Sequence, residues 1–255
     1  MPASFGGKVA LVTGAAGGMG RAIAVAFGQA GADVLVADLA AEQGEATAEL
    51  VRETGARAHS VTTDVADGAS VEAMVAAAVE RFGGLDCAVN GAAIELETVR
   101  LHELEDDVFD RVIAVNLRSI YLSMKHEIRV MLEQGRGGSI VNIASTNSFR
   151  PQPHHSAYTA SKHGVLGMTR NAAMDYAADG IRVNAICPGA IDTPMLRSAM
   201  ERRGRDPKDV AARLSLLGRF GDPNEIAMAA LWLCSDESSF TLGHALAVDG
   251  GYLAR

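Results

Sequence analysis

Cysteine and long apolar runs are both scarce in this chain of 255 residues. The three cysteines are Cys87, Cys187 and Cys234, which lie far apart and lack the paired spacing of a zinc site or a CxxC redox motif. Scattered cysteines favour buried free thiols in a reducing compartment over a disulfide framework, so a cytoplasmic protein is expected. No segment approaches roughly 18 uninterrupted apolar residues, and the N-terminus lacks the regions of a secretion signal. We therefore expect neither a membrane span nor secretion.

Positive charge is in deficit as well. The formal net charge is −8 and the sequence pI is about 5.4, which would repel a phosphate backbone. The densest basic stretch, residues 202–205, is interrupted by Gly204 and flanked by acidic residues. His154 and His155 suggest a metal site, but adjacent side chains diverge and do not easily share one ligand sphere, which favours a loop lining a pocket. The sequence therefore predicts a small-molecule substrate, no nucleic-acid partner and no metal.

What the chain does have is a regular alternation of two hydrophobic patterns. Short β-rich runs occupy residues 8–13, 33–38, 58–63, 85–90, 138–145, 181–186 and 244–249. Segments with apolar residues near a 3.6-residue spacing lie between them, at residues 21–32, 41–53, 70–82, 107–134, 156–178 and 224–235. This alternation predicts an α/β fold, a doubly wound (Rossmann) seven-stranded parallel sheet with helices on both faces.

Nothing in the sequence divides the chain. It has no internal repeat, low-complexity tract or Pro/Gly-rich linker, so residues 1–255 are expected to form a single dinucleotide-binding and catalytic domain. Residues 194–220 break the rhythm, because a charged middle lies between apolar flanks. We interpret this segment as a lid that covers the substrate.

A glycine-rich turn follows the first predicted strand and opens the first helix. Its spacing is Thr13-Gly14-x-x-x-Gly18-x-Gly20, wider than the GxGxxG fingerprint. Gly14 permits the tight turn, Gly18 lets the backbone approach a pyrophosphate, and Gly20 lets the helix pack closely on the strand. A flexible loop is the alternative, but the position directly after strand one favours a dinucleotide phosphate site.

The choice between NAD and NADP depends on Asp38, the last residue of the second predicted strand. A carboxylate at this distance from the turn accepts hydrogen bonds from the adenosine ribose hydroxyls and repels a 2′-phosphate. No basic residue lies between Arg21 and Arg52 to hold such a phosphate. Asp38 also has a compatible alternative role, capping the helix predicted to begin near Ala41. The predicted cofactor is NAD.

Together with the glycine-rich turn, three features resemble the short-chain dehydrogenase/reductase family. They are Tyr158-Thr-Ala-Ser-Lys162, Ser145 thirteen positions before the tyrosine, and Asn116 within the run VNLRS. The resemblance covers the full chain and extends to Asp64-Val65, where the family binds adenine, and to residues 188–193, where it holds the nicotinamide carboxamide.

One segment departs from the family pattern. Residues 90–93 read Asn-Gly-Ala-Ala, where the family usually has Asn-Asn-Ala-Gly. Gly91 lacks the usual side-chain amide and Ala93 adds a methyl group near the cofactor. The contacts of the fourth strand with the nicotinamide ribose are therefore the least secure part of the resemblance.

The chemistry of hydride transfer needs a matching proton on oxygen, and Tyr158 is the predicted acid/base. A free tyrosine has a pKa near 10, so this role calls for a lower pKa, and Lys162, one helical turn away, supplies positive charge. Ser145, after the fifth strand, is placed to hydrogen-bond the substrate oxygen. By resemblance, Asn116 links Lys162 through water to solvent; the alternative is an amide that satisfies local backbone groups in a bent helix.

The complete set of site residues is larger. The predicted catalytic residues are Ser145, Tyr158, Lys162 and Asn116. The predicted cofactor-binding residues are Thr13, Gly14, Gly18, Met19, Gly20, Asp38, Leu39, Asp64, Val65, Asn90, Ala92, Tyr158, Lys162, Pro188, Gly189, Ile191 and Thr193. The predicted substrate-pocket residues are Ile94, Glu95, Asn147, Gln152, His155 and Met195.

These residues predict an NAD-dependent oxidoreductase that transfers a hydride between NAD(H) and the carbinol or carbonyl carbon of a small secondary alcohol, cyclic diol or ketone. The alternatives are an enzyme like a 3-oxoacyl-carrier-protein reductase, which typically takes NADPH, and a non-catalytic nucleotide-sensing protein, which would not need the catalytic residues present here. By resemblance, the helices around residues 108–134 and 156–178 and the C-terminal strand build subunit contacts of a homotetramer.

Overall fold

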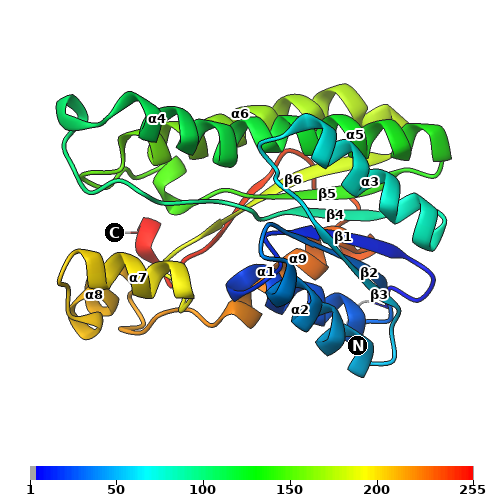
Figure 1. The fold of residues 1–255 in the computed structure, drawn as a ribbon, viewed down its shortest axis with the longest axis horizontal. Coiled ribbons are helices and arrows are strands. Elements are labelled where there is room, and N and C mark those ends of the chain that lie inside the picture. The colour runs from blue at the N-terminus through cyan, green and yellow to red at the C-terminus, as the bar shows by residue number, and fades with distance from the viewer. Residues whose placement is uncertain (1–3, 255) are drawn as a thin grey trace.

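The computed structural model describes residues 4–254, which form one seven-stranded sheet in the order β3-β2-β1-β4-β5-β6-β7 (Figure 1). The strands are β1 (Val9–Thr13), β2 (Asp33–Asp38), β3 (Ala58–Thr62), β4 (Cys87–Asn90), β5 (Gly138–Ile143), β6 (Ile181–Pro188) and β7 (Ala245–Val248). Every neighbouring pair is parallel. The predicted parallel sheet is confirmed, and all seven strands lie within the predicted runs or extend them by two residues.

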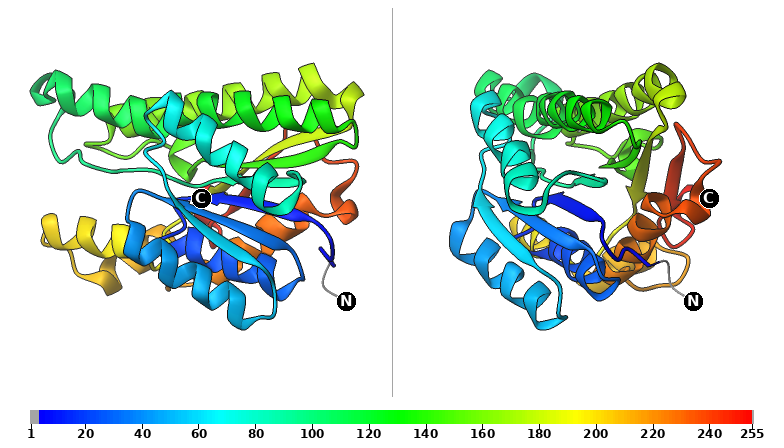
Figure 2. Two further views of the ribbon diagram at one scale, coloured as in Figure 1. Left: turned by 45° about the vertical axis from the view of Figure 1, so that its right-hand side comes forward. Right: turned by 90° about the vertical axis from the view of Figure 1, so that its right-hand side faces the viewer.

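Helices cover both faces of the sheet, as the two further views in Figure 2 show. One face carries α3 (Gly68–Phe82), α4 (Asp106–Ile113), α5 (Ser119–Gln134) and α6 (Ser156–Tyr176), and the other carries α1 (Gly18–Gln29), α2 (Ala41–Glu53) and α9 (Pro223–Cys234). Each face has its own apolar core, because strands buried on both sides present side chains to both layers. This arrangement leaves the carboxyl ends of the strands as the edge where a ligand can bind.

The segment predicted as one helix over residues 107–134 is three pieces in the structure. A π-helical turn, Ala114–Arg118, separates α4 from α5. The turn widens around Asn116, whose fully buried side chain hydrogen-bonds a neighbouring loop. A 3.6-residue pattern continues through such a turn and does not reveal it.

Residues 194–220 contain two short helices, α7 (Pro194–Arg202) and α8 (Pro207–Leu214). Both begin with proline, and the side chains of Thr193 and Asp206 cap their N-termini. They lie together at the end of the molecule where the C-terminal turn Tyr252–Ala254 also lies, at the carboxyl ends of the strands (Figure 1). The segment is therefore placed beside the edge where ligands bind.

Three further findings bear on the function. The cysteines Cys87, Cys187 and Cys234 are free and buried. Within residues 4–254, no helix is long and apolar enough to cross a membrane. The same residues contain no group of three or more His, Cys, Asp or Glu side chains that could hold a metal ion.

Candidate active site

The glycine-rich turn leaves the N-terminus of α1 open. Gly14 has a φ of +71°, and a Cβ there would lie 2.8 Å from the Cα of Ala92, while a Cβ on Gly20 would lie 2.1 Å from the carbonyl oxygen of Gly14. Gly17, at the N-cap, provides no side-chain cap, and the first turn of α1 holds no acidic residue. Unpaired amide groups and the positive end of the helix dipole form a cradle that suits a phosphate.

A cavity of about 160 Å³ continues from this turn along the ends of β2, β3 and β4. Its lining residues are Gly14, Asp38, Leu39, Thr63, Asp64, Val65, Ala92, Ala93, Ile94, Arg111 and Val115. The buried hydroxyl of Thr63 has no hydrogen-bond partner among the described residues, so a polar ligand group could satisfy it. The cradle and this cavity together fit the two phosphates and the adenosine of a dinucleotide.

Asp38 organises that cavity through its carboxylate. One oxygen accepts a hydrogen bond from the amide of Ala16 in the glycine-rich turn at 2.9 Å, and the other accepts one from the amide of Ala40 at 3.0 Å. The Asp38 side chain therefore joins the turn after β1 to the turn before α2. Its bond to Ala40, the N-cap residue of α2, is similar to the helix-capping role that was the alternative for Asp38. Each oxygen still has a lone pair available for a ribose hydroxyl.

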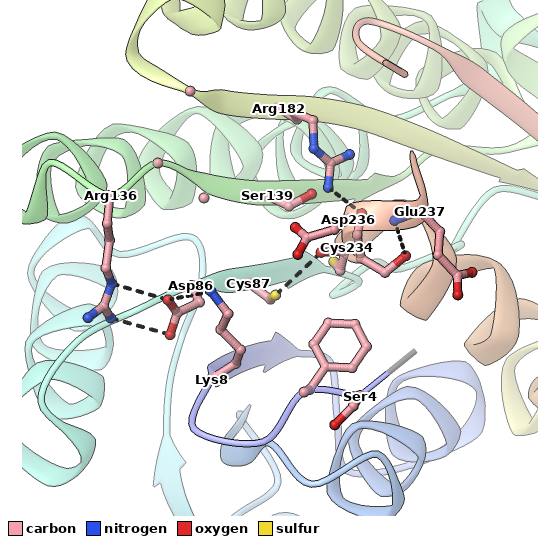
Figure 3. Close-up of a pocket in the computed structure, with 15 residues that line it drawn as sticks. Ser4, Lys8, Asp86, Cys87, Arg136, Ser139, Arg182, Cys234, Asp236 and Glu237 are labelled. Atoms are coloured by element: carbon pink, nitrogen blue, oxygen red, sulfur yellow. Dashed lines mark hydrogen bonds and ion pairs between the residues drawn. The ribbon is translucent and has the colours of Figure 1, made fainter. Parts of the chain in front are cut away.

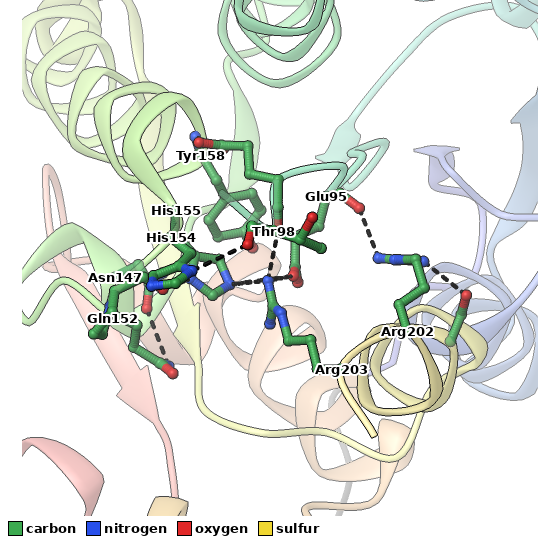
Figure 4. Close-up of polar contacts among 12 residues, drawn as sticks. Glu95, Thr98, Asn147, Gln152, His154, His155, Tyr158, Arg202 and Arg203 are labelled. Carbon is green, nitrogen blue, oxygen red and sulfur yellow. Dashed lines mark hydrogen bonds and ion pairs between the residues drawn. The ribbon is translucent and has the colours of Figure 1, made fainter. Parts of the chain in front are cut away.

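A second cavity, of about 100 Å³, lies at the ends of β5 and β6. It is lined by Glu95, Ser145, Thr146, Asn147, Gln152, His155, Tyr158, Gly189, Ala190, Leu196, Leu214 and Tyr252. Four of the six predicted pocket residues line it, namely Glu95, Asn147, Gln152 and His155 (Figure 4). Ile94 lines the first cavity instead, and Met195 lies outside both, with Leu196 in its predicted place.

Two of the four predicted catalytic side chains, Ser145 and Tyr158, line this second cavity, and Lys162 lies behind Tyr158. Ser145 follows β5, and its hydroxyl accepts a hydrogen bond from the amide of Asn147 at 3.1 Å. Tyr158 and Lys162 lie on one face of α6, with the Lys162 Nζ 5.7 Å from the centre of the Tyr158 ring. Lys162 is almost fully buried, and its ammonium donates to the carbonyl oxygen of Ile143 at 2.8 Å. A phenol, a hydroxyl and an ammonium thus meet beside one small cavity.

The predicted low pKa of Tyr158 is not a property of the protein alone. Burial and, to a smaller extent, the charge of Glu95 raise the pKa of Tyr158 to about 12, and a hydrogen bond with Ser145 only partly offsets them. Burial also lowers the pKa of Lys162 to about 8. In the chain by itself, burial of both groups outweighs the charge of Lys162, and a lower pKa of Tyr158 with oxidised nicotinamide bound stays a prediction.

Asn116 is held in the way that the structural alternative described. Its side-chain oxygen accepts from the amide of Ile94 at 2.8 Å, and its side-chain nitrogen donates to the carbonyl oxygen of Ile94 at 2.9 Å. These paired bonds fasten the π-helical turn to the loop after β4. A link from Asn116 to Lys162 through water stays a prediction.

Among the remaining predicted cofactor residues, Thr13 and Thr193 lie at the glycine-rich turn, whereas the side chain of Asn90 lies in the core. Thr13 accepts the amide of Gly91 at 3.0 Å, and Thr193 packs against Gly18, so both contribute to the shape of the glycine-rich turn. Asn90 points away from the edge, because its amide donates to Glu127 and Asn142, both at 3.1 Å, in the core. The Asn90 side chain therefore stabilises the sheet and does not line either cavity.

The other cofactor predictions lie near the same edge. Pro188 ends β6 and Gly189 lines the second cavity, where a Cβ on Gly189 would lie 2.7 Å from the Cα of Asp249. Ile191 is buried and forms an isolated bridge with Gly221. Met19 lies in the first turn of α1 and packs against the core.

Sequence reasoning missed Glu97, which fixes the helix that carries Tyr158. The carboxylate of Glu97 is 2% exposed and accepts hydrogen bonds from the backbone amides of Ala157 at 2.8 Å and Tyr158 at 2.6 Å. His155, the N-cap residue of α6, makes no side-chain cap, so Glu97 takes that role from 60 residues away along the chain. No signal in the sequence pointed to Glu97, because Ser156 at the start of the predicted helix already offers a local cap residue.

A larger cavity of about 310 Å³ lies at the opposite, amino-terminal edge of the sheet (Figure 3). Its acidic centre is Asp86, whose carboxylate accepts the amide of Val9 at 2.9 Å and pairs with Arg136 at 3.2 Å and Lys8 at 3.7 Å. These groups satisfy one another and hold strands together. Size alone does not make this cavity the active site, since ligands of doubly wound sheets bind at the carboxyl ends of the strands.

Comparisons with known proteins agree with this geometry. The family model adh_short_C2, described as "Enoyl-(Acyl carrier protein) reductase", matches residues 14–253. "Short chain dehydrogenase/reductase astE" of Aspergillus oryzae is 45% identical over 249 residues, covering 97% of this chain and 95% of the relative. The 2,5-dichloro-2,5-cyclohexadiene-1,4-diol dehydrogenase of Sphingobium indicum is 43% identical over 249 residues, covering 97% of this chain and 98% of the relative.

Solved structures show the same similarity. The crystal structure of levodione reductase superposes with a TM-score of 0.93 at 38% identity, over 98% of this chain and 99% of that chain. A structure from Agrobacterium tumefaciens with bound NADP has a TM-score of 0.90 at 36% identity, over 100% of this chain and 99% of that chain. The chain therefore belongs to the short-chain dehydrogenase/reductase family and is an oxidoreductase that uses a nicotinamide nucleotide cofactor.

Proposed function

We propose that this protein is an NAD-dependent oxidoreductase that transfers a hydride between NAD(H) and the carbinol or carbonyl carbon of a small secondary alcohol, cyclic diol or ketone. The observation that carries the proposal is that Ser145 and Tyr158 line one cavity, with Lys162 beside Tyr158 and a glycine cradle suited to a dinucleotide at the same edge of the sheet. The names of two relatives, a cyclohexadiene-diol dehydrogenase and levodione reductase, support an alicyclic substrate.

In this proposal, each residue has one task. In the direction of oxidation, the phenolate oxygen of Tyr158 takes the hydroxyl proton of the alcohol while the carbinol hydrogen leaves as hydride. Ser145 positions the same oxygen, and Lys162 holds a proton near the phenol and opposes its high pKa. Bound oxidised nicotinamide supplies the hydride acceptor and a further positive charge. Asn147 and Gln152 offer amides for a second oxygen of a diol.

A spectrophotometric screen tests the proposal directly. Purified protein is mixed with NAD or NADP and a panel of secondary alcohols and cyclic diols, and the appearance of reduced nicotinamide is followed. The reverse reaction is assayed with matching ketones. Turnover of alicyclic alcohols is the expected result, and the absence of turnover across the whole panel with both cofactors would contradict the proposed function.

The cofactor preference is a prediction about Asp38. We expect kcat/KM with NAD to exceed that with NADP by about 100-fold, because a 2′-phosphate would lie against this carboxylate and each 1.4 kcal/mol is tenfold. Arg111, the basic residue that lines the same cavity, lies across it on α4. Replacing Asp38 with Ala and Leu39 with Arg should narrow or reverse the preference. Arg111→Gln is the matched control and should keep the preference for NAD. Equal use of both cofactors by the wild type would refute the predicted preference.

We also propose that the protein works as a homotetramer in the cytoplasm, with residues 194–220 as a lid within a single catalytic domain. Exposed apolar side chains on α5 and near β7 support the assembly; they include Tyr121, Leu132, Trp232 and Phe240. Light scattering should give about four times the monomer mass of 26.6 kDa. Tyr121→Glu should weaken the assembly before it lowers activity. A wild-type monomer at micromolar concentration would exclude the tetramer.

A further inference from the structure

Three side chains from separate parts of the chain meet in the wall of the substrate cavity (Figure 4). Glu95 lies in the loop after β4, His155 precedes α6, and Arg203 follows the last turn of α7. The Arg203 Nη2 lies 2.8 Å from the Glu95 Oε1 and 3.0 Å from the His155 Nε2. All three are mostly shielded from solvent, with side chains 13%, 7% and 16% exposed for Glu95, His155 and Arg203. This is the Glu95–His155–Arg203 cluster.

The cluster fastens the predicted lid to the loop after β4. The same Arg203 nitrogen also donates to the carbonyl oxygen of Glu97 at 2.8 Å, and the neighbouring Arg202 donates to the carbonyl oxygen of Glu95 at 3.0 Å. Glu97, in turn, caps the helix of Tyr158. The position of α7 is thus connected to the position of the acid/base through direct hydrogen bonds.

The contacts of the two ring nitrogens of His155 show how Arg203 can orient this side chain. The Nδ1 of His155 lies 2.8 Å from the carbonyl oxygen of Pro153, which can only accept, so Nδ1 carries a hydrogen. The Nε2 lies 3.1 Å from the Glu95 Oε1 and 3.0 Å from the Arg203 Nη2, so it accepts from the guanidinium in the neutral imidazole and donates to the carboxylate in the charged one. The His155 ring packs at 66° against the ring of Tyr158, with centroids 6.1 Å apart. Arg203 therefore orients a side chain that borders the phenol.

Charge gives Arg203 a second effect on the same phenol. Burial opposes the charge of Glu95, but His155, Arg203 and Arg202 outweigh it and lower the pKa of the Glu95 carboxyl, so it is a carboxylate. A carboxylate beside Tyr158 opposes the loss of the phenolic proton. Lys162 faces the phenol from α6, whereas Arg203 contacts the Glu95 carboxylate together with His155. Arg203 thus contributes a fixed positive charge that offsets the charge of Glu95.

We propose that Arg203 is a positioning residue of the acid/base site, which compensates Glu95 and orients His155 beside Tyr158 once α7 lies against the cavity. The inference rests on the proposed role of Tyr158. If Arg203 acts in this way, full activity requires that residues 194–220 dock against the cavity, in addition to covering the substrate. Arg203 acts through Glu95 and His155 and does not itself touch the reacting atoms.

The test is the pH profile of kcat/KM for alcohol oxidation in Arg203→Gln. Loss of this cation leaves the Glu95 carboxylate less compensated, so Tyr158 should lose its proton less readily, and the rising limb should move to higher pH by about one unit. At a fixed pH on that limb, kcat/KM should fall about tenfold. Arg202→Gln is the matched control, because its exposed guanidinium contacts the backbone of Glu95 and not the carboxylate. The charge of Arg202 acts on the Glu95 carboxyl more weakly than that of Arg203, so this variant should move the limb less.

A rescue separates charge compensation from a general structural defect. Adding Glu95→Gln to Arg203→Gln removes the uncompensated charge, so the limb should return to the wild-type position or below it. Arg203→Lys, which keeps the charge, should retain the wild-type limb even with a lower kcat. An unshifted limb in Arg203→Gln, or an equal shift in the double variant, would overturn the inference while wild-type activity still supports the proposed function. If the wild type were inactive with every substrate, both the inference and the proposed function would be refuted.

Discussion

Tyr158→Phe should lose between about 10²- and 10⁴-fold in kcat, the usual contribution of a general acid/base. The substitution removes only the hydroxyl and keeps the ring that packs against His155 and lies near Lys162. The glycine cradle and Asp38 are untouched, so the dissociation constant for NAD, measured by fluorescence titration, should change little. The predicted signature is a loss of turnover without a loss of cofactor binding.

Tyr176→Phe is the matched control for that experiment. Tyr176 ends the same helix, α6, and lies far from the cavity that Tyr158 lines. Its variant should keep wild-type kcat. A Tyr158→Phe enzyme with more than about a third of wild-type activity, when a deuterated alcohol shows that the chemical step limits turnover, would mean that another group carries the proton.

The framework of the fold could be predicted because local patterns determine it. The run DVLVAD is β2, and the segment from Ala41 to Glu53 is α2 with the bounds that periodicity indicated. The glycine spacing also placed the turn after β1, since steric exclusion at Gly14 and Gly20 acts between neighbouring segments. Such features depend on a few adjacent residues, and sequence shows them directly.

The parts that could not be predicted depend on contacts between distant residues. Glu97 caps α6 from 60 residues away, and Arg203 hydrogen-bonds to Glu95, which lies 108 residues away along the chain. No periodicity marks either contact, because each arises when separate loops converge at the carboxyl edge of the sheet. The raised pKa of Tyr158 in the chain by itself could not be predicted for a related reason, since burial is a property of the assembled core. Spacing predicted which residue types form the candidate site but not their electrostatic surroundings.

Lys162→Met should be the most damaging single change to activity and yet stabilise the fold. Lys162 is 2% exposed and donates a hydrogen bond to the carbonyl oxygen of Ile143, and it forms no ion pair with an acidic residue among residues 4–254. Without its charge, nothing on α6 opposes the high pKa of Tyr158, so kcat/KM should fall by about 10³-fold or more. By the family resemblance, Lys162 also binds the nicotinamide ribose, so NAD affinity should weaken as well.

The stability effect of Lys162→Met follows from the pKa of about 8 in the folded protein, below the 10.5 of an exposed lysine. Between these values, the unfolded chain binds the proton more tightly, so the free energy of unfolding of the wild type should rise as pH increases from 8 to 10.5. Below pH 8 the cost of the buried charge is complete. Lys162→Met removes it and should add about 2 kcal/mol at pH 7, after the lost hydrogen bond is subtracted.

Urea unfolding at several pH values measures this difference. Lys162→Met should lack the rise in the free energy of unfolding between pH 8 and 10.5 that the wild type shows. Lys8→Met serves as the matched control, because Lys8 is half-exposed beside Asp86 at the opposite edge of the sheet, and its loss should leave both kcat and this rise unchanged. If Lys162→Met were less stable than the wild type at pH 7, the buried ammonium would be stabilising the fold, and the conflict between stability and catalysis at this position would be refuted.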